Sequence, residues 1–182
     1  GSYPEFGNLL DLQVLSWPLE RVLGAPDYLN AKIFLILWLD CAACWFFLSG
    51  LWGRSAGTWL GGLLFGLNSY FVYEISNGRL RQAVAFTIPL FMFYLYRCWR
   101  QGGVRPTIVA GSLLGLTADF YHYYGMFLGF FCFLAMVWHA FLGRHQIHAR
   151  GMPARMAGIL AIGLLVAAPF ATFYLEEAFG PN

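Results

Sequence analysis

Apolar stretches long enough to cross a lipid bilayer alternate with short polar segments along most of the chain. Three of them, 55–73, 120–143 and 156–175, contain no Asp, Glu, Lys or Arg, and residues 33–53 contain only Asp40. Because about 20 apolar residues cross a bilayer as a helix, the pattern predicts an all-α, polytopic helical membrane protein. We expect about six transmembrane helices, over residues 31–53, 56–74, 82–97, 107–119, 123–142 and 156–175.

Residues 1–30 follow a different pattern. The apolar positions between Leu9 and Leu23 fit a helix that lies along the membrane interface, with Trp17 as its anchor. The segment lacks the basic and apolar regions of a signal peptide. We expect it to form an extracytoplasmic loop, followed by a helical transmembrane domain over residues 31–182.

Composition supports the same class of protein. Hydrophobic residues make up 59% of the 182 residues and charged residues 11%, whereas soluble domains have about 45–50% apolar and about 25% charged residues. The 18 Phe, 10 Tyr and 7 Trp exceed what one small core can hide from water. An ordinary soluble domain is therefore nearly excluded.

The charges are sorted between the two ends of the predicted helices. Three connections on one side carry only basic residues, and the acidic residues other than Asp40 fall on or beside the other side. Cytoplasmic loops carry an excess of Lys and Arg, so the basic side is expected to be cytoplasmic and both termini extracytoplasmic. The basic residues of these connections are Arg54, Arg97, Arg100, Arg105, Arg144, Arg150 and Arg155.

Small residues and prolines predict how the helices pack. The spacings Gly57-x-x-x-Gly61 and Gly62-x-x-x-Gly66 let helix backbones approach closely. Pro89 and Pro169 lie inside predicted spans, where proline kinks a helix. We expect a tightly packed second span and kinks in the third and sixth.

Signatures of soluble enzymes and metal sites are missing from the sequence. There is no phosphate-cradling glycine loop, HExxH motif or Cys/His metal spacing, so no cofactor is identified and nothing supports a divalent metal. Cys41 and Cys44 have redox spacing but lie within an apolar span, where a packing role is the commoner one. The basic loops are short, and anionic lipid headgroups account for them without nucleic acid.

Polar residues concentrate at the predicted outer ends of four spans. Ionisable side chains at membrane depth are costly and usually face a cavity or a partner. If the hairpins pack side by side, these residues form one pocket. They are Asn68, Glu74, Asn77, Arg79, Arg81 and Gln82 between spans two and three, and Asp119, Tyr121, His122, Tyr123 and Tyr124 between spans four and five.

Two interpretations of this polar group stay open. Guanidinium groups could hold a phosphate through paired hydrogen bonds, carboxylates and a histidine could transfer protons, and tyrosines could stack on sugar rings. Alternatively, the arginines reach the headgroups and pair with Glu74, and the tyrosines form an ordinary interfacial belt. Asp40, deep in the first span, either bonds to neighbouring helices or lines an aqueous path.

The order of several segments resembles the GT-C superfamily of polytopic membrane glycosyltransferases, above all its bacterial members. The likeness lies in the sequence and placement of these segments relative to the spans. They are 3–10 (YPEFGNLL), Asn30, 61–68 (GGLLFGLN), Tyr73-Glu74, 77–82 (NGRLRQ), 87–90 (TIPL) and 116–125 (LTADFYHYYG).

The resemblance implies an inverting enzyme that moves a sugar from a polyprenyl-phosphate carrier to an acceptor at the outer face of a bacterial cytoplasmic membrane. It implies substrate contacts by Arg79, Arg81, Gln82, Asn68, Asn77, Tyr121, Tyr123 and Tyr124. Its candidate catalytic residues are Glu74, Asp119, His122 and Asp11. The family's acid lies in the first outer loop, much of which we expect to precede Gly1, so the chain is expected to be a fragment.

A second class of function is the alternative to the transferase. A non-catalytic membrane subunit or a transporter fragment would use Asp40 and the proline kinks along a translocation path, and other membrane subunits would be its partners. This hypothesis predicts that water reaches Asp40, whereas the transferase hypothesis places the chemistry at the outer ends of the helices.

Overall fold

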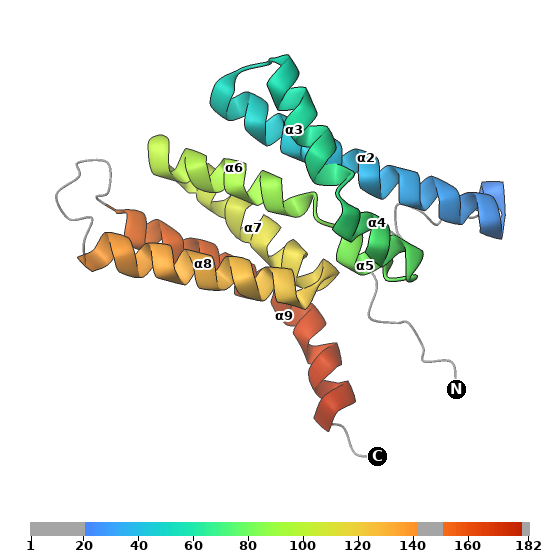
Figure 1. Ribbon diagram of the computed structural model, residues 1–182. Coiled ribbons are helices and arrows are strands. Elements are labelled where there is room, and N and C mark those ends of the chain that lie inside the picture. The colour runs from blue at the N-terminus through green and yellow to red at the C-terminus, as the bar shows by residue number, and fades with distance from the viewer. Residues whose placement is uncertain (1–20, 142–150, 180–182) are drawn as a thin grey trace.

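The computed structural model describes residues 21–141 and 151–179, and within these ranges the chain is helical with no strand (Figure 1). The predicted all-α class is therefore confirmed for this part of the chain. Its helices are α2 (Ala25–Trp52), α3 (Ala56–Gly66), α4 (Ser69–Ser76), α5 (Leu80–Ala83), α6 (Thr87–Arg100), α7 (Val104–Phe120), α8 (His122–Phe141) and α9 (Met152–Phe179).

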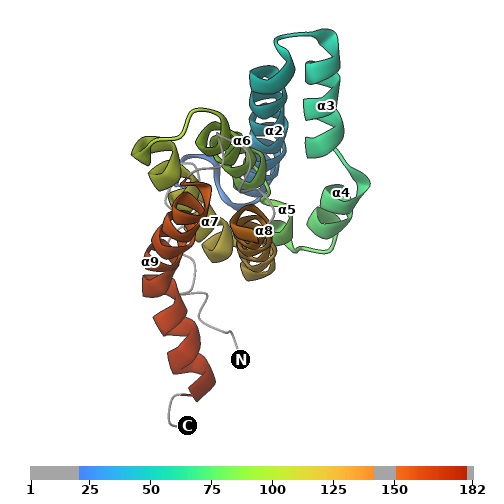
Figure 2. The same ribbon diagram turned by 90° about the vertical axis from the view of Figure 1, so that its left-hand side faces the viewer.

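The helices run back and forth between two ends of the molecule. In Figure 1 the connections from α2 to α3 and from α6 to α7 lie toward the left, and the α4–α5 turn and the α7–α8 junction lie toward the right. In Figure 2 the α2–α3 hairpin stands on one side of α6, and α7 and α9 lie on the other. Helix α7 packs against α6, α8 and α9.

Two described helices are long and apolar enough to cross a membrane, judged by length and composition: Asp27–Trp52 within α2, and Met152–Pro169 within α9. The apolar segment His122–Trp138 of α8 is shorter. At about 1.5 Å per residue, the 28 residues of α2 exceed a hydrocarbon core of about 30 Å. Helix α2 also begins at Ala25, ahead of the predicted start of the first span.

The predicted second span is not one helix. Helix α3 ends at Gly66, and Asn68 begins α4 by accepting a hydrogen bond from the Phe71 amide at 3.0 Å. The Asn68 amide group also donates to the Phe65 carbonyl at 2.6 Å. One asparagine side chain thus satisfies backbone groups on both sides of the break, which makes the interruption stable.

The predicted third span is also interrupted, and the expectation of a mid-span kink at Pro89 is wrong. Helix α5 ends at Ala83, and α6 begins at Thr87. Pro89 therefore lies in the first turn of α6, where a backbone amide has no partner within the helix and proline is tolerated.

Close contacts at glycine bring the helices together as their spacing predicts. A methyl group on Gly62 would stand 2.7 Å from the Cys41 carbonyl oxygen, and one on Gly66 would stand 2.6 Å from the Cys41 amide nitrogen. In α7, a methyl group on Gly115 would stand 2.7 Å from the Gly163 carbonyl oxygen of α9. Helices α2 and α3, and likewise α7 and α9, touch through their backbones.

The buried apolar residues form two clusters. One joins α6, α7, α8 and α9, with Phe91, Leu114 and Met156 among its members. The other joins α2, α4 and α5 and the segment after α5, and includes Ile36 and Val84. The second cluster lies under the polar end of the molecule and fixes the positions of α4 and α5.

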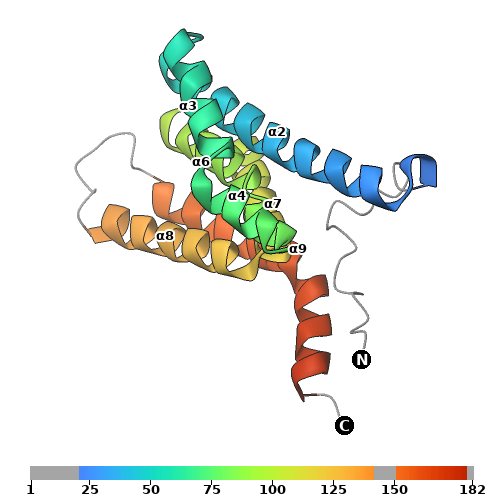
Figure 3. The same cartoon turned by 45° about the vertical axis from the view of Figure 1, so that its right-hand side comes forward.

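Helix α9 changes direction along its length, and its C-terminal part leaves the bundle (Figures 1 and 3). Pro169 lies inside this helix, in line with the predicted kink of the sixth span.

Candidate functional site

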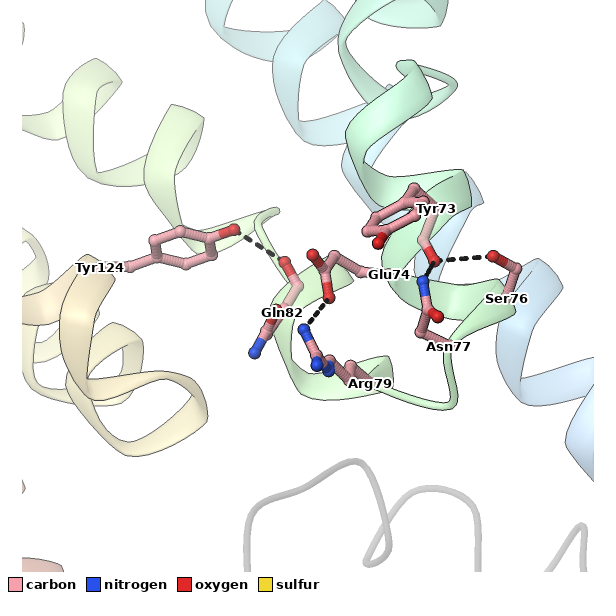
Figure 4. Close-up of polar contacts among 7 residues, drawn as sticks. All are labelled: Tyr73, Glu74, Ser76, Asn77, Arg79, Gln82 and Tyr124. Carbon is pink, nitrogen blue, oxygen red and sulfur yellow. Dashed lines mark hydrogen bonds and ion pairs between the residues drawn. The ribbon is translucent and has the colours of Figure 1, made fainter.

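An ion pair between Glu74 and Arg79 lies at the α4–α5 turn. Arg79 Nη1 stands 3.6 Å from Glu74 Oε2, and the side chain of Glu74 is 6% exposed whereas that of Arg79 is 61% exposed. Gly78, with φ of 74°, supplies the left-handed turn that reverses the chain between them. Figure 4 shows the guanidinium reaching back to the carboxylate. The pair combines a buried acid with a base that remains open to a ligand.

The junction of α7 and α8 packs directly against this turn. The Tyr124 hydroxyl donates a hydrogen bond to the Gln82 carbonyl oxygen at 2.7 Å (Figure 4). Phe120 and Tyr124 pack against the apolar cluster that includes Val84. The structure thus brings the two predicted polar segments side by side, although they are separated by 42 residues at this bond.

Tyr121 contacts three other aromatic rings at the α7–α8 junction, those of His122, Tyr123 and Tyr124. Its ring packs edge-on against Tyr124, with centroids 4.8 Å apart. Desolvation and the neighbouring Tyr70 and Tyr123 raise the pKa of the Tyr121 hydroxyl, with Glu74 acting in the same direction. This hydroxyl therefore stays protonated at neutral pH and can donate a hydrogen bond.

His122 and Tyr123 form an exposed aromatic pair beside Tyr121. Their rings lie 4.1 Å apart, and both residues are exposed. Arg81 in α5 and Asp119 in α7 are half-buried. These four predicted residues lie at the same end of the molecule as Glu74.

The two predicted asparagines have structural roles in the backbone. Asn68 begins α4, as described above, and the Asn77 amide group donates to the Tyr73 carbonyl at 2.8 Å (Figure 4). Asp11, the remaining predicted catalytic residue, lies outside the described residues. The strongest candidates are therefore Glu74, Arg79 and Tyr121.

Of the two roles predicted for Asp40, its contacts favour bonding to a neighbouring part of the bundle. Its carboxylate is fully buried, and Oδ1 accepts a hydrogen bond from the Ala85 amide at 3.0 Å, across 45 residues of sequence. This bond fixes the connection between α5 and α6. Behind it, Thr117 donates to Thr87 at 2.8 Å and links α7 to the first turn of α6.

The four cysteines contribute to packing. Each is a free thiol, and three of them, Cys44, Cys98 and Cys132, are buried. The Cys44 thiol approaches the Gly61 carbonyl oxygen at 3.8 Å. Among the described residues no group of three or more His, Cys, Asp or Glu side chains is arranged to hold a metal ion.

The chemistry available at the α4–α5 end is that of anion binding with nearby proton transfer. An exposed guanidinium can bind a phosphate oxygen, and a buried carboxylate beside it can accept a proton. Exposed aromatic rings offer flat surfaces for a sugar. Comparison of the chain with family models, with curated proteins and with solved structures found no match.

Proposed function

We propose that the chain is a multi-pass membrane protein that crosses the bilayer about six times. Supporting this, large apolar side chains stay exposed along the length of the bundle, including Phe34 on α2, Leu64 on α3, Phe127 on α8 and Leu165 on α9. Soluble monomers seldom expose apolar patches above about 300–600 Å². In a bilayer the same side chains would contact acyl chains.

The sorted charges support a definite orientation in that membrane. Arg54, Arg97, Arg100, Arg105 and Arg155 lie at the end of the bundle opposite Glu74. With the basic end in the cytoplasm, the Glu74–Arg79 pair lies at the extracytoplasmic surface. Both termini of this chain are then extracytoplasmic, as in a bacterial cytoplasmic membrane protein.

At that surface we propose binding of a polyprenyl-phosphate sugar and its use as a glycosyl donor. The single observation that carries this proposal is the packing of the turn that holds Glu74 and Arg79 against the α7–α8 junction, through the Tyr124–Gln82 hydrogen bond. Arg79, assisted by Arg81, binds the phosphate. The aromatic residues Tyr121, Tyr123 and His122 contact the sugar.

In the transfer step, the bond between the sugar's anomeric carbon and the phosphate oxygen breaks, and a bond from the acceptor oxygen to that carbon forms. The acceptor's proton moves to a carboxylate, for which Glu74 is the candidate, and polyprenyl phosphate leaves. A guanidinium stabilises the negative charge that develops on the leaving phosphate.

Native mass spectrometry of the purified chain with polyprenyl phosphate tests this proposal. We expect a bound adduct for the wild type and its loss for Arg79→Ala/Arg81→Ala, while Arg54→Ala, a change at the opposite end, retains it. Equal adducts in wild type and double variant would refute the assignment of the donor site. Full sugar transfer by the double variant would refute the catalytic proposal.

The contacts of Asp40 argue against the transport hypothesis. A residue on an aqueous path needs access to water, whereas the Asp40 side chain is fully buried and bonded to the backbone before α6. A cysteine at position 40 in a cysteine-free background should therefore resist water-soluble thiol reagents. Rapid labelling there would favour the transport hypothesis over the transferase.

A further inference from the structure

A pocket of about 390 Å³ lies between α7 and α9, at the basic end of the molecule and far from Glu74. This volume is within the range of ligand pockets, about 300–1,000 Å³. Apart from one threonine and one arginine, the pocket is lined by apolar side chains and glycine. The residues are Gly103, Val104, Thr107, Ile108, Ala154, Arg155 and Ile162.

Arg155 places a positive charge beside this apolar surface. It is half-buried, and its Nη1 donates to the Cys98 carbonyl oxygen at 3.0 Å. A guanidinium has five N–H donors, so one bond leaves most of them for a ligand. Among the residues that the structure describes, no carboxylate pairs with Arg155.

The hydroxyl of Thr107, the other polar group in the lining, already has partners within the protein. The Thr107 hydroxyl donates to the Gly103 carbonyl at 2.9 Å and contacts the Cys98 thiol at 3.7 Å. Val104 is 74% exposed and Ile108 is 47% exposed, so the apolar side of the pocket is accessible from outside the helix bundle. The pocket therefore offers a surface for hydrocarbon next to a single cationic group.

The charge around the pocket favours an anion. Arg105 is exposed in the first turn of α7, three residues before Ile108. Arg97 and Arg100 place two more guanidinium groups at the end of α6, where they stack on Phe93 and Tyr96. The described acidic residues whose side chains are placed, Asp27, Asp40, Glu74 and Asp119, all lie in other parts of the bundle.

We propose that this pocket binds an anionic phospholipid of the cytoplasmic leaflet, with an acyl chain on the apolar wall and the headgroup phosphate on Arg155. A free phosphate would leave the apolar wall unused, and a zwitterionic lipid would place a second positive charge among the arginines. The proposal rests on the membrane-spanning arrangement proposed above and is independent of the glycosyltransferase activity.

Native mass spectrometry after purification from an equimolar mixture of phosphatidylglycerol and phosphatidylcholine tests the proposal. We expect the wild type to retain phosphatidylglycerol preferentially. Arg155→Gln should retain it about tenfold less, since a charge-assisted hydrogen bond is lost, and Arg155→Lys should keep part of the preference. Arg54→Gln removes a charge at the same end outside the pocket and should match the wild type.

A second variant separates lipid binding from a folding defect. Ile108→Trp keeps the Arg155–Cys98 bond but fills the pocket, so it should also lose phosphatidylglycerol. Equal retention of the two lipids by the wild type, or unchanged retention by Arg155→Gln, would overturn the proposal. Polyprenyl phosphate added to the same samples, and to Arg79→Ala/Arg81→Ala, separates the two sites. An adduct that is lost in the double variant and kept in Arg155→Gln belongs to the Glu74–Arg79 end, so failure of one site is distinguishable from failure of the other.

Discussion

Replacement of Asp40 by alanine should loosen the connection between α5 and α6. The side chain of Asp40 accepts a hydrogen bond from the Ala85 amide at 3.0 Å. A buried amide without a partner costs about 1–3 kcal/mol. We therefore expect a loss of about 1–3 kcal/mol in the free energy of unfolding, because the position is fully buried.

Two further variants make the comparison specific. Asp40→Asn keeps an oxygen acceptor but adds a buried amide group, so its stability should lie between those of the wild type and Asp40→Ala. Asp27→Ala removes an exposed carboxylate from the first turn of the same helix and should change stability by less than about 1 kcal/mol.

Unfolding of the detergent-solubilised protein by sodium dodecyl sulfate, followed by circular dichroism, measures these free energies. Hydrogen–deuterium exchange provides a local readout, since the peptide containing Ala85 should exchange faster in Asp40→Ala while α8 stays protected. Unfolding of Asp40→Ala at the same detergent fraction as Asp27→Ala, with unchanged exchange at Ala85, would refute this role of Asp40.

Three further predictions concern packing and lipid contact. Gly66→Ala forces a methyl group against the α2 backbone and should lower the free energy of unfolding by about 1–3 kcal/mol, whereas the methyl group of Gly129→Ala points into open space. Equal stability of these two variants in the same unfolding titration would contradict the close approach of α2 and α3. Tyr124→Phe removes the hydrogen bond to the α5 backbone and should lower the free energy of unfolding by about 0.5–1.5 kcal/mol, more than Tyr123→Phe at an exposed ring. A larger loss for Tyr123→Phe would contradict the role of the Tyr124 hydrogen bond. In a variant that keeps Trp38 as its one tryptophan, brominated lipids should quench the tryptophan fluorescence, because the Trp38 side chain is 56% exposed. Quenching by aqueous iodide alone would contradict lipid contact there.

Much of the helical architecture could be predicted from the sequence, because it depends on local signals. Six apolar segments separated by polar turns correspond to the described helices, counting α3 with α4 and α5 with α6 as one segment each. The glycine spacing in α3 identifies a helix–helix contact, since the absence of side chains is itself what permits close approach. The turn at Asn77-Gly78 is likewise visible as a dipeptide.

The breaks within two of these segments could not be predicted in the same way. Hydropathy runs without interruption through Leu67, and only the capping geometry of Asn68 shows that a new helix begins there. The end of α5 depends on Asp40, whose partner is a backbone amide that any residue could supply. No residue type in the sequence marks that partner.

The candidate site was predictable as a region and only partly as a set of contacts. The polar composition of residues 68–82 and 119–124 locates it, because such residues are costly between apolar spans. Which of them face one another depends on tertiary packing. Asn77 binds its own helix, whereas Tyr124 donates a hydrogen bond across to the Gln82 carbonyl oxygen of α5.

Accessibility from the two sides of the membrane tests the central claim most directly. In a background with the four cysteines replaced by alanine, single cysteines at Asn77 and Gln101, both exposed and at opposite ends of the bundle, are treated with a membrane-impermeant maleimide. We expect the cysteine at position 77 to be labelled in intact cells and the cysteine at position 101 only after permeabilisation. Labelling of position 101 in intact cells, or labelling of both positions in the soluble fraction, would contradict the proposed multi-pass arrangement.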